Sequence, residues 1–163
     1  MAEFIIKVPS SDADVRSCFP VMRELRPAYT AENFVAQIRR QMANDRYKLA
    51  CVEMEKPLGF EVQSVAGFRL GECLAWGRFM YVDDLVTRES ARSTGCGGKL
   101  LHWLIAHARA QGCAQFHLDS GVQRFAAHRF YLTHRMEIVG HHFALKLDPL
   151  PAMPQARGGI LGA

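Results

Sequence analysis

The sequence has no long hydrophobic run, and no window reaches the ~18 consecutive apolar residues that a membrane-spanning helix needs. Its first residues, "MAEFIIKVPSSDADV", lack an apolar stretch followed by a cleavage site, so we expect no signal peptide. The basic residues are scattered, and a net charge of +4 is too small to indicate a nucleic-acid partner. These absences favour a cytoplasmic protein that binds neither membranes nor nucleic acid.

Cysteine and histidine do not show the spacing of a disulfide framework or a metal site. The five cysteines are odd in number, and no two of them form a C-x-x-C pair. The seven histidines contain no H-E-x-x-H motif, and the adjacent His141 and His142 would point to opposite faces of a strand. We therefore expect a reducing environment and no metal. Cys96 has no evident paired base, so we interpret it as a spacer rather than a nucleophile.

The chain has the length and composition of one globular domain, with 163 residues, of which 49% are hydrophobic and 22% charged. We place this domain at residues 1–147. The remaining tail, residues 148–163, is rich in proline and glycine, and we interpret it as poorly ordered or as an arm that contacts a partner.

Apolar periodicity predicts a mixed α/β domain of the α+β kind. Pro20 lies inside the first helical pattern and predicts a kink or two joined pieces. Three strands joined by short turns predict an antiparallel meander, and the segment from Met80 to Ser120 predicts a parallel, right-handed βαβ unit. The expected strands are 4–8, 47–55, 60–70, 73–87, 113–120 and one or two within 136–147, and the expected helices are 10–25, 30–42, 98–112 and 122–134.

Residues 91–101, "ARSTGCGGKLL", place three glycines at the start of the clearest predicted helix, directly after a strand. A nucleotide P-loop would need glycine at position 93 and a hydroxyl at position 100, where the chain has Ser93 and Leu100. A dinucleotide loop would need its third glycine at Leu100. A flexible turn would explain the glycines, but a helix N-terminus also presents unpaired N–H groups and a positive dipole. We therefore favour an anion site.

With its neighbouring segments, this loop resembles the GNAT acetyltransferase superfamily. The stretch "RSTGCG" fits the family's R/Q-x-x-G-x-G/A loop, "YVDDLVT" is similar to its fourth strand, and "AHRFY" is similar to its tyrosine-bearing helix. The resemblance covers residues from about 4 to 147. It implies the GNAT fold, in which a mostly antiparallel mixed sheet contains a central βαβ unit and splayed fourth and fifth strands. It also implies acetyl-CoA as acyl donor, and a homodimer is possible.

The resemblance implies that ten residues in two short runs, 85–87 and 92–98, bind acetyl-CoA. Backbone amides of the loop would hold the pyrophosphate, Arg92 could reach a phosphate, and the preceding strand would present backbone groups to the pantetheine arm. Lys99 is expected to be solvated. The implied residues are Leu85, Val86, Thr87, Arg92, Ser93, Thr94, Gly95, Cys96, Gly97 and Gly98.

Tyr131 stands where the family has its general acid, so the resemblance implies that it protonates the leaving thiolate. A phenol with a pKa of ~10 stays protonated at neutral pH. Taken from the residues alone, Tyr131 would pack beside Phe130 in the helix core. After the tyrosine the family commonly has an "LGF"-like turn, which this chain replaces with "LTHRMEI".

Carboxylates supply the remaining candidate site residues. Asp83 or Asp84 could bind a cationic amine or take its proton, directly or through water. Because adjacent strand residues point to opposite faces, we expect at most one of them in the cleft, and either could be that one. Asp119 and Ser120 are expected to line the same cleft at the end of the next strand.

The resulting prediction is an N-acetyltransferase that moves an acetyl group from acetyl-CoA to an amine by direct attack in a ternary complex. A small amine is the favoured acceptor. A protein or peptide amine is the alternative acceptor, and a non-catalytic acyl-CoA-binding regulatory module is the alternative class, because one fold hosts several functions.

Overall fold

The computed structural model describes residues 4–147, so the predicted tail at 148–163 lies outside the described residues. The chain divides into two compact units, one ending at Gly121 and one beginning at Val122, and each is described by itself. In the described part of the chain, no helix has the length and apolar character needed to cross a membrane.

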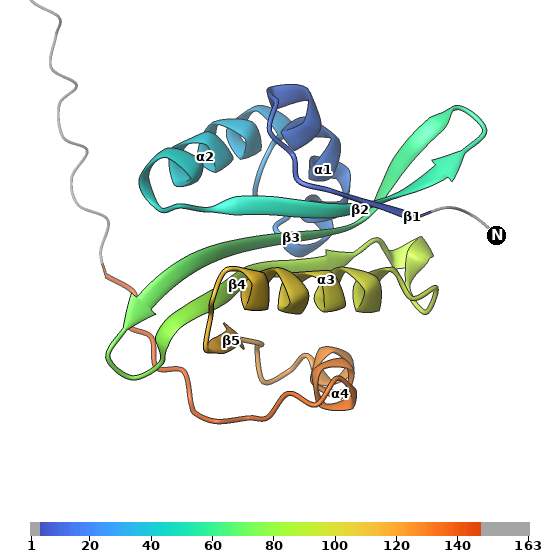
Figure 1. Ribbon diagram of the computed structural model, residues 1–163. Helices are drawn as coiled ribbons and strands as arrows, with labels where there is room; N and C mark the ends of the chain where they lie inside the picture. The colour runs from blue at the N-terminus through green and yellow to red at the C-terminus, as the bar shows by residue number, and fades with distance from the viewer. Residues whose placement is uncertain (1–3, 148–163) are drawn as a thin grey trace, which may run out of the picture. The chain divides into compact units, whose positions relative to one another are not determined.

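The first unit contains one five-stranded sheet whose strands are neighbours in chain order. The first three pairings are antiparallel, and the last pairs β4 with β5 in parallel. The predicted meander and the parallel strand–helix–strand unit are thereby confirmed (Figure 1). The elements are β1 (Phe4–Lys7), α1 (Asp12–Leu25), α2 (Ala31–Asn44), β2 (Lys48–Lys56), β3 (Gly59–Cys73), β4 (Gly77–Thr87), the 3-10 turn η1 (Glu89–Ala91), α3 (Cys96–Ala110) and β5 (Gln115–Leu118).

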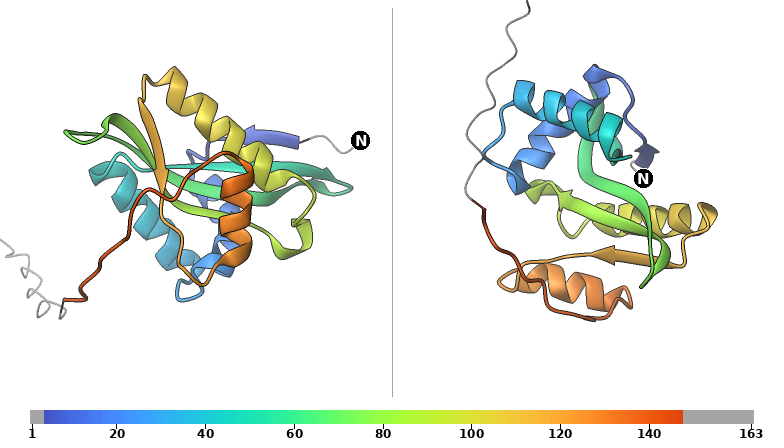
Figure 2. Two further views of the ribbon diagram at one scale, coloured as in Figure 1. Left: turned by 90° about the horizontal axis from the view of Figure 1, so that it is seen from below. Right: turned by 90° about the vertical axis from the view of Figure 1, so that its left-hand side faces the viewer.

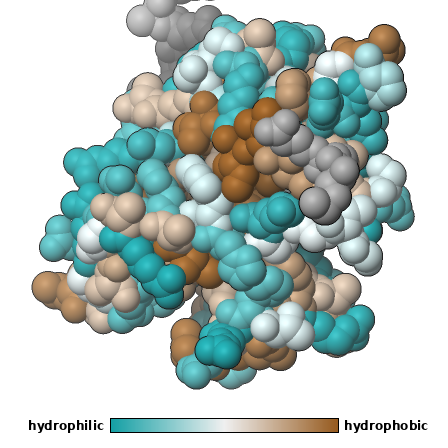
Figure 3. Space-filling view, turned by 45° about the vertical axis from the view of Figure 1, so that its right-hand side comes forward, coloured by the Kyte–Doolittle hydropathy of each residue, from teal (hydrophilic) through white to brown (hydrophobic). Residues whose placement is uncertain are grey.

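Helices cover both faces of this sheet, with α1 and α2 on one face and α3 on the other (Figures 1 and 2). Each face has its own hydrophobic core. Val15, Phe34 and Leu49 are buried in the α1–α2 core, whereas Phe68 and Leu104 are buried in the α3 core. Polar residues dominate the face drawn in Figure 3, with hydrophobic side chains gathered between them. Burial on both faces fixes the register of the central strands, because a one-residue slip would exchange the two faces.

Two local expectations for this unit differ from the structure. Helix α1 is one continuous helix with Pro20 inside it, so the two-piece alternative is wrong and a kink at Pro20 stays a prediction. The sequence predicts a turn at Gly71 and Glu72, but both residues lie within β3. Gly71 pairs with Phe79, and a Cβ at Gly71 would lie 2.7 Å from the Phe79 ring. This glycine therefore makes room for an aromatic ring rather than forming the turn.

Strand β4 carries a bulge and then leaves β5. On β3, the adjacent residues Gly67 and Phe68 pair with Asp84 and Val82, so Asp83 is an extra residue on β4. The pairing with β5 ends at Val82, although β4 continues to Thr87. The two strands are therefore splayed as the resemblance implied.

The second unit contains α4 (Phe125–Thr133), inside the predicted helical range. The strands predicted within 136–147 are wrong, because the structure has no strand in that range. Ile138, Val139 and Phe143 remain 75%, 78% and 91% exposed. A strand needs a neighbour that supplies backbone hydrogen bonds, and alternation of residue types does not show whether one is present.

Helix α4 ends in a Schellman motif, although this chain has "LTHRMEI" where the family has an "LGF"-like turn. The Met136 N–H donates to the Tyr131 carbonyl, and the Arg135 N–H donates to the Leu132 carbonyl. Arg135 has a φ of +63°, the left-handed conformation that glycine normally takes at this position. The chain thus keeps the turn of the "LGF"-like pattern with arginine in the place of glycine.

Candidate active site

The glycine loop leads directly into the N-terminus of α3. Gly95 is the N-cap, with a φ of +89°, and Ser93 is also left-handed, with a φ of +65°. No side chain caps this helix. The amides of Cys96, Gly97 and Gly98 lie in the first turn, where helix geometry provides no intrahelical acceptor. A Cβ at Gly95 would meet nothing within 4 Å, so the left-handed φ rather than a lack of space favours glycine here.

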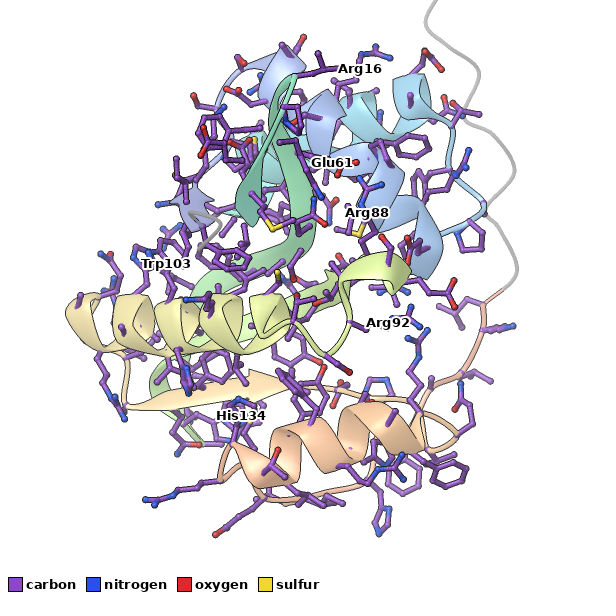
Figure 4. The ribbon with its side chains drawn as sticks, turned by 90° about the vertical axis from the view of Figure 1, so that its right-hand side faces the viewer. Arg16, Glu61, Arg88, Arg92, Trp103 and His134 are labelled. Atoms are coloured by element: carbon purple, nitrogen blue, oxygen red, sulfur yellow. The ribbon has the colours of Figure 1, made fainter. Side chains whose placement is uncertain are left out.

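Contacts from the sheet and from the loop itself hold the loop in place. Arg88, between β4 and η1, donates to the Val62 carbonyl and forms an ion pair with Glu61 at 3.3 Å (Figure 4). The Thr94 hydroxyl donates to the Ala91 carbonyl at 2.6 Å. Cys96 is fully buried, which is the position of a packing residue rather than of an exposed nucleophile. The loop backbone is therefore fixed by residues on both sides of it.

The two cations of the loop differ in their surroundings. Arg92 extends from the loop before α3 with a 59% exposed side chain, and its guanidinium lies 3.5 Å from the Glu24 carboxylate (Figure 4). Lys99 places its ammonium 5.0 Å from the centre of the Phe4 ring, a cation–π contact on β1. Arg92 also donates to the Thr87 carbonyl at 3.5 Å, so its two contacts are long and its side chain is exposed, whereas Lys99 lies over a ring of another strand.

The last residues of β4 present an open strand edge next to the loop. Leu85, Val86 and Thr87 pair with β3, but among the described residues no strand lies on their other side. The Ser64 hydroxyl donates to the Val86 carbonyl at 3.0 Å and lies 2.9 Å from the Thr87 hydroxyl, which ties this segment to β3. An extended ligand could therefore pair with the free edge as an added strand would.

Asp83 and Asp84 both line one pocket of about 370 Å³ between α1, α2 and β4. The expectation that at most one of them faces the cleft where the thioester reacts stays a prediction. Alternation along a strand holds only while the ladder is regular, and the bulge at Asp83 places an extra residue before Asp84. The pocket residues are Met22, Arg26, Tyr29, Phe34, Gln37, Ile38, Gln41, Tyr47, Asp83 and Asp84.

Each of the two carboxylates has an arginine partner. Arg69 holds both oxygens of Asp83, with its Nε 2.8 Å from Oδ2 and its terminal nitrogen 2.7 Å from Oδ1. Arg26 donates from Nε to Oδ1 of Asp84 at 2.7 Å. The other Asp84 oxygen accepts from the Tyr47 hydroxyl at 3.2 Å. Both aspartates are therefore partners of an arginine in charge-assisted hydrogen bonds.

Tyr47 reaches Asp84 only because position 67 is glycine. A Cβ at Gly67 would lie 1.7 Å from the Tyr47 hydroxyl oxygen, which is inside its van der Waals radius. Burial raises the pKa of Tyr47, and the neighbouring Asp84 carboxylate raises it further. The phenol is therefore a permanent proton donor that holds one oxygen of Asp84.

Asp119 and Ser120 occupy a different place from the aspartate pair. The Tyr81 hydroxyl of β4 donates to the carboxylate of Asp119, which follows the last residue of β5, and neither Asp119 nor Ser120 lines the pocket. Burial, followed by the bond to Asp119, raises the pKa of Tyr81. The Ser120 hydroxyl is buried and has no hydrogen-bond partner among the described residues.

Tyr131 lies on α4, in the second unit, and its ring packs against Phe130 with 5.5 Å between ring centres. Burial raises the pKa of Tyr131, and the nearby Arg124 partly opposes this rise. The phenol therefore remains protonated well above neutral pH. Its assignment as the general acid stays a prediction.

Sequence reasoning missed the residues that hold the aspartates. Arg26 and Tyr47 are 58 and 37 positions from Asp84 in the chain, and neither stands in a recognisable motif. Gly67 looks like any strand glycine until the neighbouring phenol is seen. Only the separation of β4 from β5 could have been anticipated, because the family resemblance implies splayed fourth and fifth strands.

Comparison with known proteins places the chain in a family. Residues 15–135 match the model of the acetyltransferase (GNAT) family. An uncharacterized N-acetyltransferase of Bacillus subtilis, YhdJ, is 28% identical over 126 residues, which cover 77% of this chain and 86% of that protein.

Solved structures share the fold at lower sequence identity. Aminoglycoside N-acetyltransferase AAC(6')-Iy in complex with CoA has a TM-score of 0.76 at 9% identity, covering 90% of this chain and 96% of that one. A transcriptional regulator from Bacillus halodurans C-125 has a TM-score of 0.75 at 17% identity, covering 89% of this chain and 100% of that one. The chain therefore belongs to the GNAT family of acetyl-CoA-dependent N-acetyltransferases.

The residues present fit the acyl donor that this family uses. The uncapped start of α3, the left-handed Gly95 and the open edge of β4 adjoin one another in the chain. A pyrophosphate needs backbone N–H donors and a positive helix end, and an extended amide-containing arm needs a free strand edge. This segment supplies both features.

Proposed function

We propose that this chain transfers the acetyl group of acetyl-CoA to the amine of a small molecule by direct attack in a ternary complex. The observation that carries this proposal is the pocket that contains Asp83 and Asp84, on the strand that leads into the glycine loop. Its volume of about 370 Å³ falls at the lower end of the ~300–1,000 Å³ typical of small-molecule sites. That size favours a compact amine over a protein segment.

On the donor side, the amides of Gly95–Gly98 would bind the pyrophosphate, with help from the α3 dipole. Arg92 would exchange its loose contact with Glu24 for a phosphate oxygen. The free edge of Leu85–Thr87 would align the pantetheine arm. Bound acetyl-CoA supplies a thioester whose carbonyl carbon is the electrophile.

On the acceptor side, the amine must lose its positive charge before its lone pair can form the new N–C bond. Asp84 is the proposed partner of this amine, because both oxygens of Asp83 are held by one arginine. As the C–S bond breaks, its electron pair passes to sulfur, and Tyr131 donates a proton there. The amine proton leaves through a carboxylate or water, and the phenol is reprotonated from solvent.

Release of free thiol from acetyl-CoA, measured with a panel of small amines and lysine peptides, tests this function. Tyr131→Phe should lower kcat by about 100-fold or more and leave the affinity for acetyl-CoA unchanged, since positioned acids typically contribute 10²–10⁴-fold. Unchanged kcat would remove Tyr131 from the mechanism. Turnover of peptides alone would indicate a protein acetyltransferase, and acetyl-CoA binding without any turnover would indicate a regulatory module.

A further inference from the structure

The pocket combines an apolar wall with a small number of charged groups. Met22, Phe34 and Ile38 are buried residues that line its apolar side, together with Tyr29. Gln37 and Gln41 add side-chain amides from α2. The charged residues that line it are Arg26, Asp83 and Asp84. An occupant of this pocket therefore needs an apolar body and a group that one of these charges can recognise.

The two carboxylates differ in where their cation comes from. Asp83 is held in a bidentate pair by Arg69, which does not line the pocket. Asp84 is held by Arg26, which does line the pocket and follows the last residue of α1. Arg26 is thus the cation that the pocket itself contains, and it occupies one oxygen of Asp84.

Exposure shows which partner of this ion pair can move. The Asp84 side chain is 14% exposed and the Arg26 side chain is 50% exposed, while Tyr47, on the other Asp84 oxygen, is buried. An ion pair whose arginine is exposed to water contributes little to stability. A carboxylate that is largely removed from water is costly to leave without a cation. Asp84 therefore requires a cation, and Arg26 is an exchangeable one.

We propose that the acceptor binds as an ammonium on Asp84 by displacing the Arg26 guanidinium, with an apolar or aromatic body against Met22, Phe34 and Ile38. This inference rests on the proposed function and names its substrate class as a compact, singly charged amine with an apolar body. Arg26 then acts as a built-in competitor. It weakens the binding of every cationic acceptor and keeps Asp84 paired when no acceptor is present.

Calorimetric titration with benzylamine and benzyl alcohol tests this inference on the CoA-saturated protein. The two probes have nearly the same shape, but only benzylamine carries a positive charge at neutral pH. Arg26→Gln should bind benzylamine about tenfold more tightly than the original chain, with benzyl alcohol unchanged. Arg26→Lys should return the affinity toward the original value, because it restores a competing cation. Asp84→Asn should remove the preference for benzylamine.

Arg16→Gln is the matched control, because Arg16 also belongs to α1 and forms an exposed ion pair with Glu32 at 3.1 Å, but does not line the pocket. This variant should bind both probes like the original chain. Equal benzylamine affinity in the Arg26→Gln and Arg16→Gln variants, or an equal change for both probes, would overturn the inference. No measurable benzylamine binding by any variant would overturn it as well. Failure of the proposed function is separate, since it would appear as absent thiol release with every amine.

Discussion

Helices α1 and α3 begin in opposite ways. At α1, the Ser11 hydroxyl accepts from the Asp14 N–H at 3.1 Å, and the Asp14 carboxylate accepts from the Ser11 N–H, which forms a capping box. At α3, the N-cap is Gly95, no side chain caps the helix, and the first turn contains no acidic residue. The comparison indicates that one helix satisfies its first amides with its own side chains, whereas the other leaves its first amides without a side-chain cap.

The largest expected effect comes from giving α3 an acidic first turn. Gly97→Glu would place a carboxylate beside the amides that a pyrophosphate needs, so acetyl-CoA affinity should fall on the order of 100-fold. Stability should stay the same or rise slightly, because acidic residues stabilise helix N-termini. Calorimetric titration with CoA and urea unfolding measure the two effects. Normal CoA binding by this variant would contradict the assignment of the loop.

Lys99→Gln provides the matched control two positions later in the same helix. Because the Lys99 ammonium lies over the Phe4 ring, this substitution should leave CoA affinity within about twofold of the original. A loss comparable to that of Gly97→Glu would instead place Lys99 at the phosphate.

Removing the serine cap of α1 should lower stability and leave CoA affinity unchanged, which is the reverse of the result expected for Gly97→Glu. Ser11→Ala should lower the free energy of unfolding by about 1 kcal/mol, the usual value of an N-cap serine. It should leave CoA affinity unchanged. Ser17→Ala, later in α1, should change stability by less than about 0.5 kcal/mol. If urea unfolding gave the same value for both variants, the capping box would have no special role.

Helices α3 and α4 also differ in the left-handed residue that follows each C-terminus. Helix α3 is followed by Gly112 with a φ of +72°, whereas α4 is followed by Arg135 with a φ of +63°. Arg135→Gly should raise the free energy of unfolding by about 0.5–1 kcal/mol, because relief of left-handed strain exceeds the added chain entropy. Arg129→Gly, inside α4, should lower it by about 1 kcal/mol. Loss of stability in Arg135→Gly would show that the arginine side chain stabilises the turn.

The smallest effect concerns acid stability of the α1 cap. The hydrogen bond from the Lys7 ammonium, and then those from Ser11, lower the pKa of Asp14 below its usual range. A lowered folded-state pKa contributes stability that is present above the unfolded pKa, about 3.9, and is lost as the pH falls through the folded pKa. Asp14→Asn should therefore flatten the loss of stability below about pH 4. Parallel acid unfolding curves for the two proteins would contradict this prediction.

Elements with local signals were predicted well. The helix after the glycine loop and the parallel strand–helix–strand unit follow from neighbouring residues, and both are present in the structure. The turn placed at Gly71 and the strands placed within 136–147 were wrong. The first depends on the Phe79 ring of the facing strand, and the second depends on a pairing partner, neither of which a local pattern can reveal.

The candidate site divides in the same way. The sequence by itself determined the family, and it predicts the donor loop, because a pyrophosphate is bound by backbone groups whose geometry is set by a few consecutive residues. The tertiary structure decided that Asp83 and Asp84 share one pocket, since a single extra residue against β3 changes which way they face. It also decided that Arg26 and Tyr47 meet Asp84. Such contacts depend on the packing of α1, β2 and β4, which no short segment specifies.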